Sequence, residues 1–283
     1  MERLVKDRLD VVVLYSSGHL GSMIVLNRML KMKCYRIKAI VSATNVEINE
    51  KGFRKVTKQI RKSGFLFSFM LFLQRLIQAA AYGLTYVPFF RKRLKTSTDI
   101  AAELDIPLYQ TSDINDDETR EFLTSLGPDL LLSAYFPMIL KKEALNIPSI
   151  GVLNIHPGWL PEYKGVMAYF WAVKNDENYA GVSVHWMDEG IDTGPLLARR
   201  KFRIGRKTTQ EKVLIMTAAV GSRILHRIGK KLVKGKEVPE IDVSSEKSNY
   251  YTMPTADEYL EYRSRNKFFK ITTLLSIIVV RDR

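Results

Sequence analysis

The chain has 283 residues, 46% hydrophobic and 26% charged, and these proportions exclude a wholly disordered protein. Its single cysteine, Cys34, excludes an internal disulfide framework and a cysteine-based structural zinc site. The net charge of +14 suggests a nucleic-acid-binding protein at first sight. However, residues 51–95 hold eleven Lys or Arg and no Asp or Glu, so the rest of the chain is nearly neutral and the charge is local.

Strand-like and helix-like patterns alternate over the first half of the chain. Continuous apolar runs predict strands that are covered on both faces, at 10–15, 35–43, 106–110, 129–135 and 151–156. Helical patterns separate these strands, and the one at 115–126 carries acidic residues in its first turn. This alternation predicts a doubly wound, Rossmann-like α/β domain with a mainly parallel sheet and with ligand sites beyond the carboxyl ends of its strands.

The pattern changes after residue 156. Residues 180–188 alternate between apolar and polar types and a further strand at 195–204 follows closely, so we expect an antiparallel addition to the sheet. Thr208 and Glu211 have the spacing of a capping box, which predicts a long helix that runs to about Val233.

These patterns divide the chain into two parts. Residues 1–207 form the main α/β domain, with 51–95 as a basic and apolar helical insert, and residues 208–283 form a C-terminal helix and a short extension. The opening MERLVKDRLDVVVLY leads into the first core strand and does not have the pattern of a signal peptide. Together with the single cysteine, this indicates a cytoplasmic protein.

Two polar segments lie where this fold places its ligand sites. Asn154 and His156 are two residues apart at the end of a predicted strand, so their side chains project from the same face. The loop at 187–195 is acidic and rich in glycine, and it contains Asp192. An amide, an imidazole and a carboxylate that meet there suit acyl transfer to an amine, because they can stabilise an oxyanion, move a proton and orient the imidazole. The residues alone leave a second interpretation open, in which the histidine is structural and the aspartate belongs to a turn.

Two separated segments resemble the folate-dependent formyltransferase family, which includes glycinamide ribonucleotide, methionyl-tRNA and sugar N-formyltransferases. The first is IPSIGVLNIHPGWLPEYKG (147–165), with the pattern N-x-H-x-x-x-L-P, and the second is GVSVHWMDEGIDTGPLLARRKFRI (181–204), with the pattern H-(x)6-D followed by a glycine. The matching positions are Asn154, His156, Leu160, Pro161, His185, Asp192 and Gly194. The resemblance spans roughly residues 8–207 and implies the formyltransferase fold.

The resemblance also implies a mechanism without a metal. An acceptor amine attacks the formyl carbon of 10-formyltetrahydrofolate, and Asn154 donates to the resulting oxyanion with help from His156. Asp192 positions and charges His156 and assists proton movement from the amine toward the folate nitrogen. His185 has either a direct role or a structural one. The pterin is expected against Met138, Ile139 and Leu140 and against the backbone of the 188–192 loop, which includes Asp188 and Gly190.

Two further loops bear on the comparison with the family. Gly158 and Trp159 stand where the family has Ser and Leu, which alters the lining of the loop without removing a catalytic group. The segment SSGHLGS (16–22) resembles the loop that holds acceptor phosphate in part of the family, although we favour a glycine turn that admits close helix packing. His19 in this loop is a candidate contact for an acceptor.

The insert at 51–95 has an apolar stretch at 65–73 with basic residues on both sides. This stretch is too short to span a bilayer but fits an interfacial helix or hairpin on an anionic membrane surface, as does the apolar C-terminal stretch within 267–283. We therefore expect a cytoplasmic protein that is peripheral on the inner face of a membrane. Alternatively, the two segments cover each other or form a homodimer interface.

The C-terminal part of the chain bears on the identity of the acceptor. Methionyl-tRNA formyltransferases carry a separate β-rich C-terminal domain that grips RNA, whereas residues 208–283 show no clear strand series. We therefore favour a small-molecule or lipid-linked amine, such as an amino sugar on a nucleotide or lipid carrier, over tRNA. A methionyl-tRNA formyltransferase-like enzyme, a 10-formyltetrahydrofolate hydrolase and a non-catalytic binding protein on the same fold stay open as alternatives.

Overall fold

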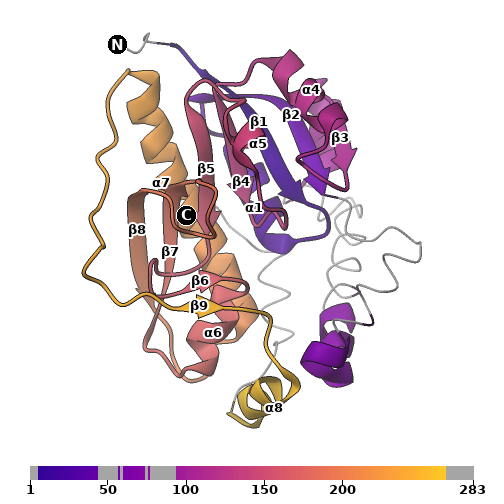
Figure 1. The fold of residues 1–283 in the computed structure, drawn as a ribbon, viewed down its shortest axis with the longest axis vertical. Helices are drawn as coiled ribbons and strands as arrows, with labels where there is room; N and C mark the ends of the chain where they lie inside the picture. Colours follow the sequence, from indigo (N-terminus) through magenta and orange to yellow (C-terminus); the bar gives the residue numbers. More distant parts are fainter. Residues whose placement is uncertain (1–5, 44–56, 58–59, 74–75, 77–93, 266–283) are drawn as a thin grey trace.

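The computed structural model describes residues 6–43, 57, 60–73, 76 and 94–265. Within these residues a seven-stranded sheet has the order β3-β2-β1-β4-β5-β7-β8 (Figure 1). Its strands are β1 (Leu9–Ser16), β2 (Tyr35–Ala43), β3 (Leu108–Thr111), β4 (Leu130–Ala134), β5 (Gly151–His156), β7 (Tyr179–Trp186) and β8 (Leu196–Arg203). The strands from β1 to β5 pair in parallel, and β7 and β8 are added antiparallel. The expected mainly parallel sheet with an antiparallel addition is confirmed.

The buried strands send their side chains alternately into two helical layers. In β1, Val11 and Val13 face the core cluster that includes α1 (Leu20–Met29), α3 (Ser97–Leu104) and α7 (Gln210–Val233). Val12 and Leu14 face the opposite cluster, which includes α4 (Asp117–Leu126) and α5 (Lys142–Leu145). A strand that is apolar at every position is expected when helices cover both faces of a sheet. The doubly wound α/β fold class is therefore confirmed.

The helix α7 begins one residue later than the capping pattern indicates. Its N-cap is Thr209, whose side chain accepts a hydrogen bond from an N–H of the first turn at 3.3 Å. Thr208 instead closes the preceding turn, where its hydroxyl accepts from the N–H of Gly205 at 2.9 Å. Glu211 is buried, and its burial raises the pKa of its carboxyl to about 7. The predicted Thr208–Glu211 capping box is therefore wrong, whereas the predicted helix end at Val233 is confirmed.

The long helix α7 packs along α1 and the sheet. Its buried side chains Leu214, Ala218 and Leu225 belong to the same core cluster as β1. A Cβ atom at Gly221 would lie only 2.5 Å from the side chain of Ile155 on β5, so the helix backbone approaches the strand closely. Because α7 and the sheet share one core, the division of the chain at residue 207 stays a prediction.

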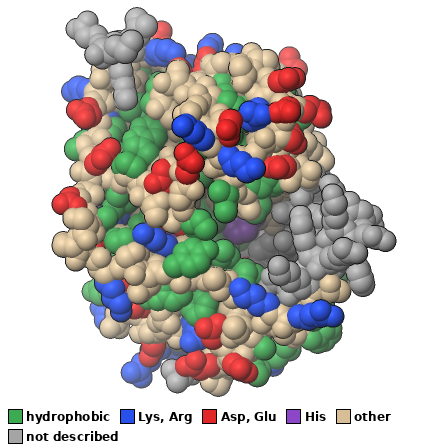
Figure 2. All heavy atoms as spheres, viewed as in Figure 1, with side chains coloured by type: hydrophobic (Ala, Val, Ile, Leu, Met, Phe, Trp, Pro, Cys, Tyr) green, Lys and Arg blue, Asp and Glu red, His purple; other side chains and the backbone are tan. Residues whose placement is uncertain are grey.

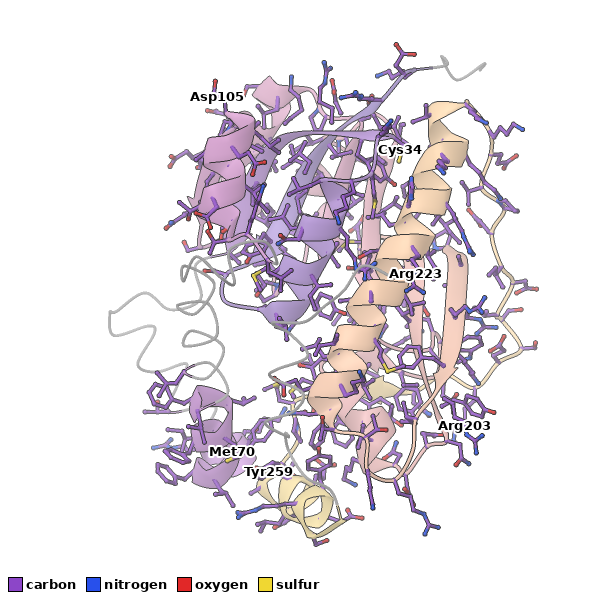
Figure 3. All side chains as sticks on the ribbon, turned by 180° about the vertical axis from the view of Figure 1, so that it is seen from behind. Cys34, Met70, Asp105, Arg203, Arg223 and Tyr259 are labelled. Atoms are coloured by element: carbon purple, nitrogen blue, oxygen red, sulfur yellow. The ribbon has the colours of Figure 1, made fainter. Side chains whose placement is uncertain are left out.

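A smaller apolar cluster joins α6 (Ala168–Lys174), α8 (Ala256–Arg265) and the helical residues 60–73 of the insert. Phe67 is fully buried, with its ring 5.0 Å from that of Tyr259 and 6.3 Å from that of Phe170. Figure 3 shows Met70 and Tyr259 next to each other on the two helices. Residues 60–73 of the predicted insert are thus helical and pack on α8, while the predicted C-terminal segment 267–283 lies outside the described residues.

A short parallel pair of strands accompanies this cluster, formed by β6 (Lys164–Gly165) and β9 (Tyr250–Tyr251). It ties the segment after α7 to the loop that follows β5, through backbone hydrogen bonds on both sides of Gly165. Across the described ranges, no helix is both long enough and apolar enough to cross a membrane.

Candidate functional site

The strands β5 and β7 place two polar side chains opposite each other. In β5, Leu153 and Ile155 point into the core, so Asn154 and His156 share the other face. The antiparallel register pairs Asn154 directly with His185 of β7. Directly opposed side chains in such a ladder lie within contact distance. The fold therefore brings together an amide and two imidazoles at the carboxyl end of β5, where α/β proteins bind ligands.

The ring of His185 is held by two neighbours. Its Nδ1 lies 2.7 Å from the carbonyl oxygen of Trp186, and its Nε2 lies 3.1 Å from Nδ2 of Asn154. A carbonyl oxygen only accepts, so Nδ1 carries a proton, and Nε2 accepts from the Asn154 amide. His185 is 1% exposed, so the packing around its ring also holds it in this orientation. As a result, His185 determines which way the amide of Asn154 faces.

His156 is a buried imidazole with an acceptor beside each nitrogen. Its Nε2 lies 2.6 Å from the carbonyl oxygen of Tyr163, and its Nδ1 lies 3.2 Å from Oδ1 of Asp192. Burial alone would lower the pKa of His156, but the charge and hydrogen bond of Asp192 and the Tyr163 carbonyl outweigh it and raise the pKa above its ordinary value. The geometry thus favours the doubly protonated, positively charged ring.

Asp192 lies in the loop between β7 and β8 and has a left-handed backbone with φ of 54°, which aspartate tolerates better than most residues. Its Oδ2 accepts from the N–H of Gly165 at 2.7 Å, and its Oδ1 is 3.5 Å from Nε2 of His185. Burial alone would raise the pKa of its carboxyl, but the charge and hydrogen bond of His156 and the hydrogen bond from Gly165 bring the pKa well below its usual range. The carboxylate is therefore ionised and pairs with His156.

We call these four side chains, Asn154, His156, His185 and Asp192, the site network. The structure brings together all three predicted catalytic residues and His185. Asn154 is half-buried, while both histidines are almost fully covered. Figure 2 shows hydrophobic side chains exposed over the middle of this face of the molecule, with acidic and basic side chains around them. An accessible amide beside a buried imidazolium can stabilise negative charge that develops on a substrate oxygen.

The residues predicted to contact folate differ in how exposed their side chains are. Ile139 is 58% exposed, Met138 is half-buried, and Leu140 is 1% exposed with its side chain in the core. Leu140 can thus offer only its backbone to a ligand, whereas the side chain of Ile139 is exposed. Asp188 holds the shape of its own loop, because its carboxylate accepts from the N–H of Gly190 at 3.1 Å and from Thr193.

Two apolar side chains that the motifs do not single out are exposed close to Asp192. Ile191 precedes it and is 40% exposed, and Val166 follows Gly165 and is 43% exposed. Exposed apolar surface beside a buried ion pair suits a flat ring system such as a pterin, so the residues present fit the implied formyl donor. Sequence reasoning missed them because their signal is exposure, which a pattern does not give.

The loop after β5 is packed against His156. A Cβ atom at Gly158 would lie 2.7 Å from His156 Nε2 and 2.7 Å from the Ala168 side chain, so the loop backbone approaches both residues closely. Ser183 of β7 fixes the loop on its other side, because its hydroxyl donates to the carbonyl of Gly158 at 2.8 Å and accepts from the N–H of Leu160 at 3.0 Å. Ser183 is a further residue that the sequence motifs did not identify.

The loop at 16–22 packs against the residue that follows β4. The ring of His19 stacks on that of Tyr135 at 4.8 Å, and a Cβ atom at Gly21 would lie 2.6 Å from the Tyr135 ring. Close packing thus accounts for Gly21, as favoured from the sequence. A contact between His19 and an acceptor stays a prediction.

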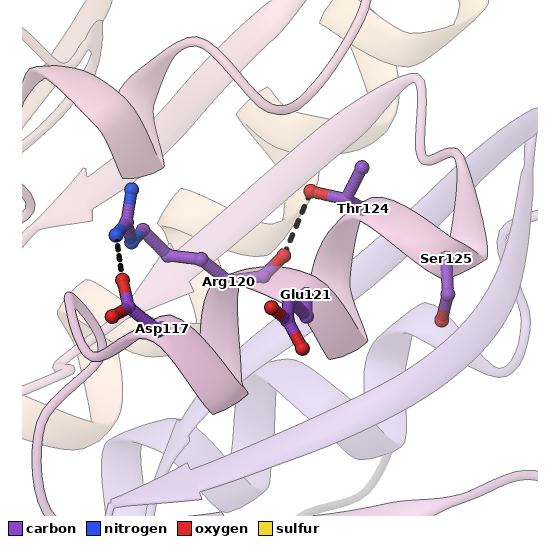
Figure 4. A pocket seen from close by; sticks show the side chains of 5 residues that line it. All are labelled: Asp117, Arg120, Glu121, Thr124 and Ser125. Atoms are coloured by element: carbon purple, nitrogen blue, oxygen red, sulfur yellow. Dashed lines mark hydrogen bonds and ion pairs between the residues drawn. The ribbon is translucent and has the colours of Figure 1, made fainter.

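A separate depression runs along α4 and is lined by Asp117, Arg120, Glu121, Thr124 and Ser125 (Figure 4). Arg120 pairs with Asp117, and the hydroxyl of Thr124 donates to the Arg120 carbonyl at 2.7 Å. All of its residues belong to one helix and none belongs to the site network. In the part of the chain that the structure describes, no group of three or more His, Cys, Asp or Glu is arranged to hold a metal ion.

The fold and the site network define an α/β protein with an amide, two imidazoles and a carboxylate gathered at one edge of its sheet. The formyl transferase family matches residues 81–228, a range that contains the whole network. The chain belongs to the formyl transferase family. The family resemblance expected from the two sequence motifs is therefore confirmed.

Individual relatives agree with this assignment. A methionyl-tRNA formyltransferase from Clostridium tetani is 33% identical over 156 residues, which is 55% of this chain and 50% of that protein. The chain thus spans about half the length of the curated relatives that it matches. Glycinamide ribonucleotide transformylase 1 from Symbiobacterium toebii has 16% identity and a TM-score of 0.55, over 81% of this chain and 89% of that one.

A second solved structure is an N-formyltransferase from Helicobacter canadensis in complex with folinic acid and dTDP-3-aminofucose. It has 16% identity and a TM-score of 0.53, over 87% of this chain and 71% of that one. Both structures show that this chain has the formyltransferase fold.

Proposed function

We propose that the protein transfers a formyl group from 10-formyltetrahydrofolate to a primary amine, with Asn154, His156 and Asp192 as its catalytic residues. The observation that carries the proposal is the site network, in which a half-buried amide lies beside a buried imidazolium–carboxylate pair. The bound folate supplies the formyl group. Folinic acid in the related Helicobacter canadensis structure supports this type of donor.

The three side chains have different tasks. When an amine adds to a formyl carbon, negative charge develops on the formyl oxygen, and the Asn154 amide donates a hydrogen bond to that oxygen. Both nitrogens of His156 are taken by Tyr163 and Asp192, so His156 acts as a nearby positive charge. Asp192 keeps His156 charged and oriented. Its low pKa makes it a weak base, so we assign the proton of the amine to water that Asp192 positions. The same water returns a proton to the folate nitrogen as the bond between that nitrogen and the formyl carbon breaks, which releases tetrahydrofolate.

For the acceptor we propose a small-molecule or lipid-linked amine, such as an amino sugar on a nucleotide or lipid carrier. The fold shared with a protein that was crystallised with dTDP-3-aminofucose supports this choice. Methionyl-tRNA is the second candidate, because curated relatives at 33% identity are methionyl-tRNA formyltransferases. We further propose a cytoplasmic location, since Cys34 is a free, buried thiol.

An acceptor panel tests these proposals. The full chain is incubated with 10-formyltetrahydrofolate and nucleotide-linked amino sugars, free amino sugars, methionyl-tRNA or no amine. Release of tetrahydrofolate and the gain of one formyl group by mass are measured. We expect formylation of an amino sugar, and a loss of about two orders of magnitude or more in Asn154→Ala, His156→Ala and Asp192→Asn.

Ser125→Ala, in the depression along α4, is the control that should keep full activity. Formylated methionyl-tRNA would replace the acceptor assignment, and formate without any amine would indicate a hydrolase. Absence of tetrahydrofolate release under every condition would favour a non-catalytic binding protein and overturn the proposal.

A further inference from the structure

The helical residues 60–73 of the insert are apolar on two opposite faces. The inner face holds Phe67, which is 0% exposed, and it packs on α8 and α6. The outer face holds large apolar side chains that are open to solvent: Phe65 is 71% exposed, Phe69 46% and Phe72 57%. We call these three residues the phenylalanine face.

The spacing of these residues makes the outer face one continuous stripe. Intervals of four and three residues place positions 65, 69 and 72 above one another on a helix. The buried positions 63 and 67 fall on the opposite side at about 100° per residue. A helix that is apolar all round is normally covered all round. Among the residues that the structure describes, α8 and α6 cover one side, and the phenylalanine face is left exposed for a partner.

The charges around the stripe indicate what that partner is. Arg61 and Lys62 are exposed on the turn that precedes Phe65, and the helical angle places one on each side of the stripe. The surrounding segment 51–95 has eleven basic residues and no acidic one. A partner that complements this segment is therefore both apolar and anionic.

We propose that the phenylalanine face docks on an anionic lipid bilayer, with residues 60–73 lying in the plane of the interface. Aromatic and aliphatic side chains on one face, bordered by Lys and Arg, are the pattern of interfacial helices. Each basic residue near an anionic surface adds to the attraction. A nucleic-acid-binding face would instead carry its basic side chains across the middle, in contact with phosphates. The docking proposal does not depend on the identity of the amine acceptor.

Vesicle flotation of the full chain tests the proposal. The vesicles contain either phosphatidylcholine alone or phosphatidylcholine mixed with phosphatidylglycerol. We expect the wild-type protein to float with the anionic vesicles and to be released by high salt. The triple variant Phe65→Ser, Phe69→Ser, Phe72→Ser should lose binding by more than about tenfold, because three apolar side chains no longer enter the interface.

The variants separate a loss of vesicle binding from a loss of folding. All three phenylalanines are exposed, so the thermal unfolding midpoint of the triple variant should change little. Leu104→Ser, at the end of α3 and 41% exposed, is a matched control that should float like the wild type. The charge variant Arg61→Glu, Lys62→Glu should weaken binding to anionic vesicles and leave acceptor formylation unchanged.

Three results would overturn the proposal. The first is failure of the wild-type protein to float with anionic vesicles. The second is equal flotation of the triple variant and the wild type. The third is a dimer in analytical ultracentrifugation that the triple variant dissociates while vesicle binding is absent, because the phenylalanine face would then contact a second copy of the chain.

Discussion

The Nδ2 atom of Asn154 lies 3.1 Å from Nε2 of His185, whose Nδ1 lies 2.7 Å from the carbonyl oxygen of Trp186. The backbone carbonyl thus selects the tautomer of the ring, and the ring selects the orientation of the amide. In the proposed mechanism the second N–H of Asn154 is then left for the substrate oxygen. His185 acts through Asn154 and is a positioning residue.

We predict that His185→Ala lowers kcat by about 10–100-fold, the usual cost of removing a residue that orients a functional ligand. A double-mutant cycle in the formylation assay tests the coupling. If His185 acts through Asn154, the double variant Asn154→Ala, His185→Ala should be no slower than Asn154→Ala alone. Losses that multiply in the double variant would show that His185 has an independent role.

Part of this site could be predicted from the sequence. The two-residue interval placed Asn154 and His156 on one face of a strand, and the second motif supplied Asp192. The pairing of Asn154 with His185 could not be predicted, because it depends on the register of β5 against β7 across 31 residues of chain.

The backbone groups that bind His156 and Asp192 could not be predicted from the sequence either. The carbonyl of Tyr163 and the N–H of Gly165 complete the environment of His156 and Asp192, but every residue has these groups. The fold was more predictable, because continuous apolar strands require cover on both faces. The start of α7 was not, since Thr208 and Thr209 are both good caps and only the preceding turn decides between them.

The titration of His156 provides a second prediction. In the wild-type protein the pKa of His156 lies above 6.5, the ordinary value for histidine. In Asp192→Asn the raising charge is lost and burial remains, so the pKa of His156 should fall below 6.5. Imidazole NMR shifts followed with pH measure both values. His226 on α7 is the internal control and should titrate identically in the two proteins.

The ion pair of His156 and Asp192 should stabilise the folded protein only over a limited pH range. The raised pKa of His156 contributes stability that is fully present below about pH 6.5 and is lost as the pH rises through the folded value. The lowered pKa of Asp192 contributes stability that is present above about pH 3.9 and is lost as the pH falls through the folded value. The unfolding midpoints of wild type and Asp192→Asn should therefore differ most between about pH 4 and 6.5. A difference independent of pH would contradict the ion pair.

The third prediction concerns Gly158. An added Cβ atom would lie 2.7 Å from Nε2 of His156, so Gly158→Ala should push the ring away from the Tyr163 carbonyl. Overpacking of this kind costs about 1–3 kcal/mol of unfolding free energy, and we expect formylation to fall at least about tenfold. Gly205→Ala is the matched control, because nothing lies within 4 Å of its Cβ position. Equal activities in the two variants would argue against tight packing at His156.

The last prediction concerns the contact between Tyr251 and the loop that holds Asp192. The ring of Tyr251 stacks on that of Tyr163 at 5.1 Å, its carbonyl accepts from the N–H of Val166 at 2.9 Å, and the neighbouring N–H of Gly165 donates to Asp192. Removal of the ring in Tyr251→Ala should loosen this loop, since aromatic pairs contribute about 0.5–1.5 kcal/mol beyond their buried area.

Hydrogen exchange measures the effect directly. In Tyr251→Ala we expect faster exchange of the amide of Gly165, together with a lower kcat, because Asp192 loses a fixed hydrogen-bond donor. Tyr179→Ala, at the start of β7, removes a tyrosine ring that is 52% exposed and should disturb the loop much less. Unchanged exchange at Gly165 in Tyr251→Ala would mean that β6 holds Asp192 without help from β9. A selective increase in Tyr251→Ala would instead show that the segment after α7 shapes the proposed catalytic centre.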